Sequence, residues 1–129
     1  MGSFLDSIAV SASGLRAEAL RLRHVAENIA NADTPGYRRK LVSFEPLALP
    51  GDLVGVTTGQ VQLDQTELPK VYDPSHPLAD GSGNYQGSNV SLIYEVADSR
   101  EAQRSYEANL QMIDQARKMA SAALDLLRR

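Results

Sequence analysis

Few residues in this sequence could do chemistry, and they are widely scattered. The chain has no cysteine, and His24 and His76 each stand alone, with no second histidine near enough in sequence to complete a ligand set. We also find no nucleophile paired with a base, and no glycine-rich phosphate loop ahead of a helix. The sequence therefore predicts no catalytic residues, no enzyme activity and no cofactor.

One acidic stretch imitates the first half of a calcium loop. Asp80, Ser82 and Asn84 alternate as such ligands do. However, Tyr85 stands where the loop needs glycine, and Ser91 stands where it needs a bidentate glutamate. The sequence therefore predicts no metal site here.

Composition excludes several classes of protein. The 129 residues amount to one domain or less, and the formal net charge of −3 argues against a nucleic-acid-binding protein. No apolar run approaches the roughly 20 residues that span a bilayer. The first residues lack a basic region followed by a continuous apolar core, so we expect no cleaved signal peptide.

The chain is organised around the stretch NIANADTPGYRRK, which runs from Asn28 to Lys40. Pro35 and Gly36 occupy the two central positions of a type II turn, where proline fixes φ and glycine permits a positive φ. Proline also disfavours a helical residue before it, so a preceding helix must stop near Asn31. The amides of Asn28 and Asn31 can bond the carbonyls that the last helical turn leaves free.

The segment before this turn predicts a helix of about 43 Å, with Ser3 as its N-cap. Its apolar residues recur at spacings of three and four, as in a coiled coil, and form a first seam: Leu5, Ile8, Ala12, Leu15, Ala19, Leu22, Ala26 and Ile29. Gly14 weakens the helix by about 1 kcal/mol relative to alanine. An ordinary amphipathic helix is one interpretation, and a helix that orders only among neighbours is the other. His24 lies off the seam, so we expect it to face solvent.

The segment after Ser91, which we expect to act as N-cap, predicts a second long helix. Its second seam is interrupted by Arg117 and comprises Tyr106, Leu110, Ile113, Ala120, Leu124 and Leu127. A flanking apolar stripe widens this face: Met112, Ala116, Met119, Ala123 and Leu126. Two helices do not enclose a core, so the excess apolar surface must meet other subunits. We expect the two helices to run antiparallel and the two seams to recognise each other.

The segment between the helices is rich in proline and glycine, which excludes a long helix. Val54–Val56 and Val61–Leu63 alternate with period two and predict a short hairpin, and Leu68–Tyr72 can add a strand. The predicted fold is mainly α, with long terminal helices forming an antiparallel coiled-coil pair around a small irregular β-hairpin segment. We expect three parts: residues 1–40, 41–90 and 91–129.

The stretch ANADTPGYRR resembles the signature of bacterial flagellar rod and hook proteins. The signature residues here are Asn28, Asn31, Thr34, Pro35, Gly36, Tyr37, Arg38 and Arg39. Two further stretches resemble the proximal-rod proteins of that group: VYDPSHPLADGSGNY at Val71–Tyr85, and RSYEAN at Arg104–Asn109. The resemblance covers nearly the whole chain.

This resemblance implies a structural subunit of the flagellar basal-body rod, whose terminal helices assemble into the axial drive shaft for motility. It implies self-assembly, other rod proteins, the basal-body ring and the type III export apparatus as partners, and no nucleic acid or small-molecule substrate. It also implies location in the rod that spans the periplasm, and export without a cleaved signal. Phe4 and Ile8 match a short export motif of that family, although Ile8 also belongs to the first seam.

Two other functions remain open from the sequence. A soluble coiled-coil adaptor or export chaperone would clasp one partner between its helices, and a small hydrolase is a weaker third hypothesis. Size-exclusion behaviour separates the first two, because an adaptor should be a discrete dimer and a rod subunit should stay monomeric until it joins a filament.

Overall fold

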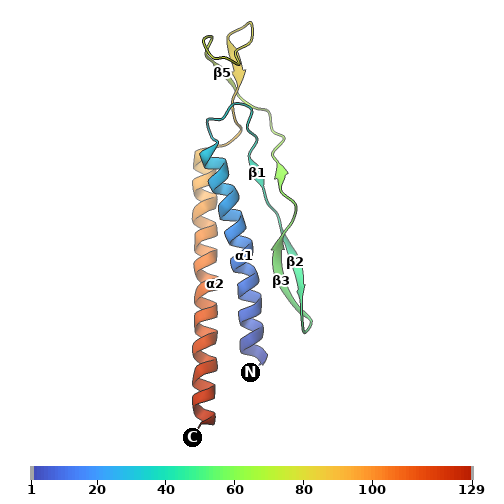
Figure 1. Ribbon diagram of the computed structural model, residues 1–129, viewed down its shortest axis with the longest axis vertical. Helices are drawn as coiled ribbons and strands as arrows, with labels where there is room; N and C mark the ends of the chain where they lie inside the picture. Colours follow the sequence, from blue (N-terminus) through green and yellow to red (C-terminus); the bar gives the residue numbers. More distant parts are fainter. Residues whose placement is uncertain (1, 129) are drawn as a thin grey trace.

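The computed structural model describes residues 2–128 and contains two long helices joined by short antiparallel strands (Figure 1). In chain order the elements are α1 (Gly2–Ala30), β1 (Lys40–Leu41), β2 (Phe44–Leu49), β3 (Leu53–Thr58), β4 (Gln62–Leu63), β5 (Lys70–Tyr72), β6 (Asn84–Gln86) and α2 (Leu92–Leu127). Within the described residues, neither helix combines the length and apolar character needed to cross a membrane. The mainly α prediction is confirmed.

The two helices pack side by side and run in opposite directions (Figure 1). α1 ends at Ala30, where the Asn31 side chain donates to the Glu27 carbonyl at 2.9 Å. The predicted type II turn follows: Gly36 has a φ of 74°, and the Tyr37 amide donates to the Thr34 carbonyl at 3.1 Å. Ser91 is the N-cap of α2 by its backbone, although its side chain makes no capping hydrogen bond. At the other end, α1 already includes Gly2, so Ser3 lies inside the helix and is not its N-cap.

The strands pair differently from the sequence-based prediction. β2 pairs with β3, β1 with β4 and β5 with β6, each pair antiparallel. The predicted hairpin between Val54–Val56 and Val61–Leu63 is therefore wrong, whereas the third predicted strand corresponds to β5. The reason lies in turn chemistry: Gly51 and Asp52 both have positive φ and close the β2–β3 hairpin. At the predicted turn, the Gly59 amide donates to the Ser43 carbonyl at 2.9 Å. The chain after β3 therefore continues alongside the residues before β2 and does not reverse direction.

The β2–β3 hairpin lies along α1 through a close backbone approach (Figure 1). Ser13, which is buried, donates to the Val10 carbonyl at 2.6 Å and accepts from the Val56 amide at 3.0 Å. A Cβ on Gly55 would stand 2.5 Å from the Ser13 hydroxyl oxygen, so glycine is required at this contact. The hairpin thereby covers one side of α1.

A second side of α1 faces α2 and is formed largely of small and polar residues. Ser11, Glu18, Val25 and Asn28 are buried there, spaced like a heptad seam but displaced around the helix from the predicted one. Gly14 does not interrupt α1, and a Cβ on it would stand 2.7 Å from the Asn109 amide nitrogen, so it permits close helix packing. The two predicted seams therefore do not form the helix contact within one chain. Ser11 and Gly14 allow the two helix backbones to approach closely because their side chains are small or absent.

Candidate functional site

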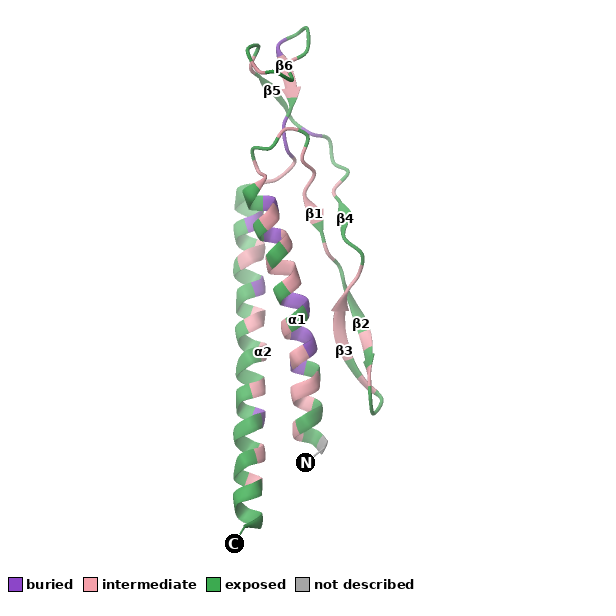
Figure 2. Ribbon diagram, viewed as in Figure 1, coloured by how far each residue is buried: buried purple, intermediate pink, exposed green. Residues whose placement is uncertain are grey.

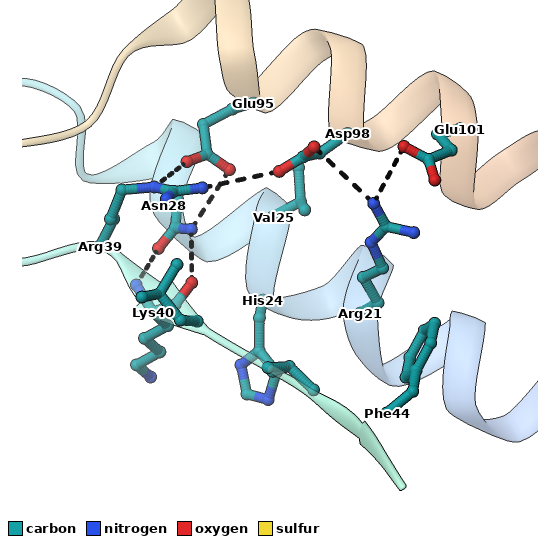
Figure 3. A pocket seen from close by; sticks show the side chains of 12 residues that line it. Arg21, His24, Val25, Asn28, Arg39, Lys40, Phe44, Glu95, Asp98 and Glu101 are labelled. Atoms are coloured by element: carbon teal, nitrogen blue, oxygen red, sulfur yellow. Dashed lines mark hydrogen bonds and ion pairs between the residues drawn. The ribbon is translucent and has the colours of Figure 1, made fainter. Parts of the chain in front are cut away.

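Asn28 and Arg39 of the signature converge with Glu95, at the start of α2, in a buried polar junction (Figure 3). Asn28 is 1% exposed, and both ends of its amide are satisfied. Its oxygen accepts from the Tyr37 hydroxyl at 2.9 Å and the Lys40 amide at 2.8 Å. Its nitrogen donates to the Lys40 carbonyl at 3.1 Å and to Glu95 Oε2 at 3.2 Å. One side chain thus links α1, the segment after the turn, and α2.

Arg39 supplies the charge of the junction. Its Nε donates to Glu95 Oε1 at 2.7 Å, and Glu95 is 0% exposed. Its terminal nitrogens lie 3.6 Å from Asp64 Oδ2 and 3.5 Å from Asp98 Oδ2. Burial alone would lower the pKa of Arg39, but the hydrogen bond and charge of Glu95, together with the two aspartates, raise it. Arg39 therefore stays charged and holds three acidic side chains at one point.

The connecting segment after β4 is fastened to the same junction. Arg38 donates to the carbonyls of Asp64 at 3.0 Å and Thr66 at 2.8 Å. Asn89 donates to the Asp64 carbonyl at 2.9 Å, and its side-chain oxygen accepts from the Arg39 amide at 2.7 Å. The backbone amide of Thr66 holds the pKa of Asp64 below its usual value. The junction therefore ties together four separate stretches of the chain.

The signature pattern predicted Asn28, Tyr37 and Arg39 of this junction but not their partners, which are Asp64, Asn89, Glu95 and Asp98. The available signal was the basic pair beside a helix end, because an arginine buried in a domain needs acidic partners. Nothing in the sequence said which of the 16 acidic residues would supply them.

A cleft of about 330 Å³ opens beside the junction, between the two helices and the strand region (Figure 3). Arg21 crosses it and lies 3.7 Å from Asp98 Oδ1 and 3.4 Å from Glu101 Oε2, with its guanidinium carbon 5.9 Å from the Phe44 ring centre. His24 also lines the cleft and its side chain is 12% exposed, so the expected solvent exposure is wrong. Phe44 and the strand region cover that side of α1, which the sequence pattern did not reveal.

The acidic stretch that imitates a calcium loop shapes the β5–β6 tip instead. Asp80 Oδ1 accepts from the amides of Ser82 at 2.9 Å and Asn84 at 3.1 Å, and these bonds lower the pKa of Asp80. His76 stacks on Tyr85 with ring centres 3.9 Å apart. Among the described residues, no group of three or more acidic or histidine side chains is placed to hold a metal ion.

None of the predicted seam residues is fully buried, and α2 as a whole is exposed along most of its length (Figure 2). We call the first seam the α1 stripe and the second seam, with Arg117 included, the α2 stripe. In the α1 stripe, Leu5 and Ile29 are exposed and Ile8, Leu15 and Leu22 are half-buried. In the α2 stripe, Leu110 is 50% and Leu127 77% exposed, Leu124 is also exposed, and Tyr106 and Ile113 are half-buried. Both stripes therefore keep apolar surface that this chain does not cover.

Phe4 and Ile8, the export-motif candidates, lie one turn apart near the start of α1 and are both half-buried. Phe4 lines a shallow cleft together with Met112, Ala116 and Met119 of α2. Phe4 thus has a packing environment within the chain, whatever its part in export.

Comparison with known proteins assigns a family to this arrangement. Residues 8–38 match the family described as "Flagella basal body rod protein", and residues 82–126 match "Flagellar basal body rod FlgEFG protein C-terminal". The flagellar basal-body rod protein FlgC of Agrobacterium fabrum is 42% identical over 127 residues, covering 92% of this chain and 91% of that protein. The chain belongs to the flagellar basal-body rod protein family.

Other FlgC proteins of the family agree in length as well as in sequence. FlgC of Salmonella typhimurium is 34% identical, covering 96% of this chain and 98% of that protein, and FlgC of Bacillus subtilis is 31% identical, covering 93% and 95%. Rod proteins of this family are structural and not enzymes, which confirms the expectation that this chain is not an enzyme. The two matched segments include the signature turn and most of both helices.

Proposed function

We propose that this chain is a FlgC-type structural subunit of the flagellar basal-body rod, and that copies assemble through α1 and α2 into the axial drive shaft. The observation that carries the proposal is the combination of family membership with uncovered apolar stripes on both terminal helices. Monomeric proteins rarely leave such a surface exposed, whereas an assembly subunit needs it.

The junction suits a subunit that transmits torque. Its charged and amide hydrogen bonds are directional, so they hold α1 and α2 at a fixed relative position. The stripes can then meet neighbouring helices with a defined geometry. We propose that in the rod these helices pack as an antiparallel coiled coil, with residues 1–40 and 91–129 in the axial core and residues 41–90 outside it.

The assembly test compares two substitutions on α2 in motile cells. Leu110→Asp places a carboxylate on the α2 stripe, and its burial against a neighbour would cost several kcal/mol. Lys118→Ala removes an exposed lysine whose ion pair among the described residues is local, with Asp114 at 3.1 Å. We expect Leu110→Asp to abolish motility and rod recovery and Lys118→Ala to retain both. Intact rods with Leu110→Asp would contradict the proposal.

We further propose that the subunit reaches the rod through the flagellar type III export apparatus without a cleaved signal, and that Phe4 and Ile8 contribute to its recognition. The basal-body ring and other rod proteins are then its neighbours. Phe4→Ala should lower the amount of exported protein at unchanged expression. Because Phe4 also packs near α2, Met112→Ala from the same cleft is the matched control, and equal loss with both variants would assign Phe4 to packing alone.

A further inference from the structure

α1 has three sides, and one of them lacks a partner among residues 2–128. Successive residues turn by about 100° around a helix, which places the α1 stripe roughly 100° from the side that faces α2 and roughly 160° from the side that faces β3. The α2 side contains Glu18 and Val25, and the β3 side contains Ser13 and Ala17, all four buried. The α1 stripe is therefore available to a helix from outside the chain.

Two basic side chains border the α1 stripe, on the side away from α2. Arg16 and Arg23 stand seven residues apart and are both exposed, and within the part of the chain that the structure describes Arg23 makes only a local ion pair, with Glu27 at 3.9 Å. On α2, the exposed Glu107 and Asp114 are also seven residues apart and border the α2 stripe in the same heptad position. Among the described residues, Arg16 and Glu107 form no ion pair. The two borders thus carry opposite charge at the same spacing.

We propose that the α1 stripe of one copy binds the α2 stripe of a second copy of this chain, with Arg16 and Arg23 opposite Asp114 and Glu107. The proposal rests on the proposed function, which gives copies a common direction. Since α1 and α2 run antiparallel within a chain, α1 of one such copy also runs antiparallel to α2 of its neighbour. In an antiparallel pair of helices, residues at the same heptad position lie on the same side of the contact. The two arginines of α1 therefore face the two acidic residues of the neighbour's α2.

This charge register also matches the apolar residues of the two stripes. It sets Leu22 against Leu110, Ile8 against Leu124, and Leu5 against Leu127. Two of the three alanines in the α1 stripe meet larger partners, with Ala19 opposite Ile113 and Ala26 opposite Tyr106, as close packing requires. Three layers depart from this pattern: Ala12 meets Ala120, Ile29 meets Gln103, and Leu15 meets Arg117, whose long side chain can extend to solvent.

Neighbouring registers are less favourable. Sliding α2 by one heptad in one direction retains the Arg16–Glu107 pair but sets Arg23 against Arg100. Sliding it the other way retains one pair and sets Arg16 against Ser121. The charges therefore select a single register among those that the heptad pattern permits.

The selected register differs from the one inside the chain, where Gly14 lies beside Asn109 and Asn28 bonds Glu95. The neighbour's α2 is displaced by about nine residues, or roughly 13 Å along the helix axis. The contact joins two different surfaces, so every copy keeps one free stripe of each kind. Such a heterologous contact propagates into a ring or a helical array, which is the geometry that a shaft needs.

Disulfide trapping tests the register directly, because the chain has no cysteine of its own. Purified full-length Leu22→Cys and Leu110→Cys chains are mixed at high concentration and oxidised. We expect at least about tenfold more cross-linked dimer than from Leu22→Cys mixed with Gln103→Cys, which lies one heptad away, as two charge pairs would give. Equal yields from the two mixtures, or no dimer from either, would overturn the proposal.

Charge reversal in the same assay tests whether the two arginines pair with the two acidic residues. Arg16→Glu with Arg23→Glu should reduce the Leu22–Leu110 cross-link about tenfold, and Glu107→Lys with Asp114→Lys in the partner chain should restore it. All four side chains are exposed, and circular dichroism checks that each variant keeps its helices. Reduction without restoration would reject the proposed pairing.

Testing for the cross-link in purified basal bodies distinguishes failure of the proposed contact from failure of the proposed rod function. Basal bodies that contain the protein but give no Leu22–Leu110 dimer would overturn the contact and leave the rod function intact. A dimer in solution from a protein absent from basal bodies would support the contact and reject the rod function.

Discussion

The two ends of the helix pair differ in chemistry: one is a buried polar junction, and the other exposes apolar side chains. At the junction, Asn28 and Glu95 are buried, and every polar atom of the Asn28 amide has a partner. At the opposite end, α2 extends beyond the start of α1, and Leu124, Leu126 and Leu127 stay exposed (Figure 1). One end is completed within the chain, and the other leaves its apolar surface for a neighbour.

This difference has a physical basis. Apolar burial is strong but non-directional, so it cannot alone decide how two smooth helices align. Buried ion pairs contribute little net stability, but they penalise any arrangement that separates them. Arg39 and Glu95 therefore suit the end where the helix register is set, and leucines suit the end where subunits join.

The largest difference between the junction and the free helix ends should appear in hydrogen-exchange rates of the isolated chain. Amides of α1 and α2 near Asn28 and Ala102 should exchange about 10³-fold more slowly than those of Met119–Leu126, because exposed helix ends open with almost no free-energy cost. Both free ends should be largely disordered in solution and become protected on assembly, since such helices draw their stability from packing. Mass spectrometry of exchanged peptides measures this gradient, and uniform protection along α2 would contradict it.

Breaking the junction should have the next largest effect. Arg39→Met leaves Glu95 buried without its cation and should lower the free energy of unfolding by about 3 kcal/mol. Urea unfolding followed by circular dichroism measures the loss. Arg23→Met is the matched control, because that side chain is 77% exposed and should change stability by less than about 0.5 kcal/mol.

A second substitution distinguishes lost pairing from lost packing at Arg39. Adding Glu95→Leu to Arg39→Met removes the stranded carboxylate and should recover much of the stability. If the double variant is as unstable as Arg39→Met alone, the packing of the arginine side chain, and not its charge, holds the junction.

The sequence predicted the parts of the fold that local chemistry decides. Pro35 and Gly36 specified the turn, the asparagines marked the end of α1, and the heptad patterns located two long helices with surplus apolar surface. The predicted relation to flagellar rod proteins was also correct, because the chain belongs to that family.

The sequence did not predict what depends on distant contacts. The hairpin was misplaced because Gly51 and Asp52 outcompeted the segment at Thr57–Gln60 as the turn. The side of α1 that faces α2 was missed because its residues, such as Ser11 and Gly14, have no apolar periodicity to detect. The acidic partners of Arg39 were missed because pairing across 56 residues leaves no local pattern.

A smaller change at the junction should produce a smaller loss. Tyr37→Phe removes the hydroxyl that donates to Asn28 Oδ1 at 2.9 Å, while the Lys40 amide still donates to that oxygen. We expect a loss of about 1 kcal/mol, the ordinary worth of one hydrogen bond. Tyr72→Phe is the control, since that exposed tyrosine lies at the β5–β6 tip. A loss as large as that of Arg39→Met would show that the Asn28 network acts as one unit.

The smallest effect concerns Glu18, a buried acid on the side of α1 that faces α2. Burial raises its pKa, Arg21 partly offsets this, and Glu101 raises it further. Because the folded chain holds the proton more tightly than the unfolded chain, stability falls as pH rises through the folded pKa. Glu18→Gln should therefore stabilise the protein at pH 7 by less than about 1 kcal/mol and make no difference near pH 4.

Glu27→Gln provides a control of opposite sign for that measurement. Its hydrogen bond with Lys40 lowers the pKa of Glu27, so its contribution is present at neutral pH and is lost as pH falls through the folded pKa. Glu27→Gln should then destabilise the chain at pH 7 and have no effect at low pH. Thermal unfolding of both variants against the parent, across pH 3.5 to 7.5, compares them directly. If both variants shift stability in the same direction, the charge of Glu18 at the helix interface, which Arg21 only partly compensates, does not destabilise the fold. Glu18 would then stabilise the contact between α1 and α2, as the charged residues of the junction do.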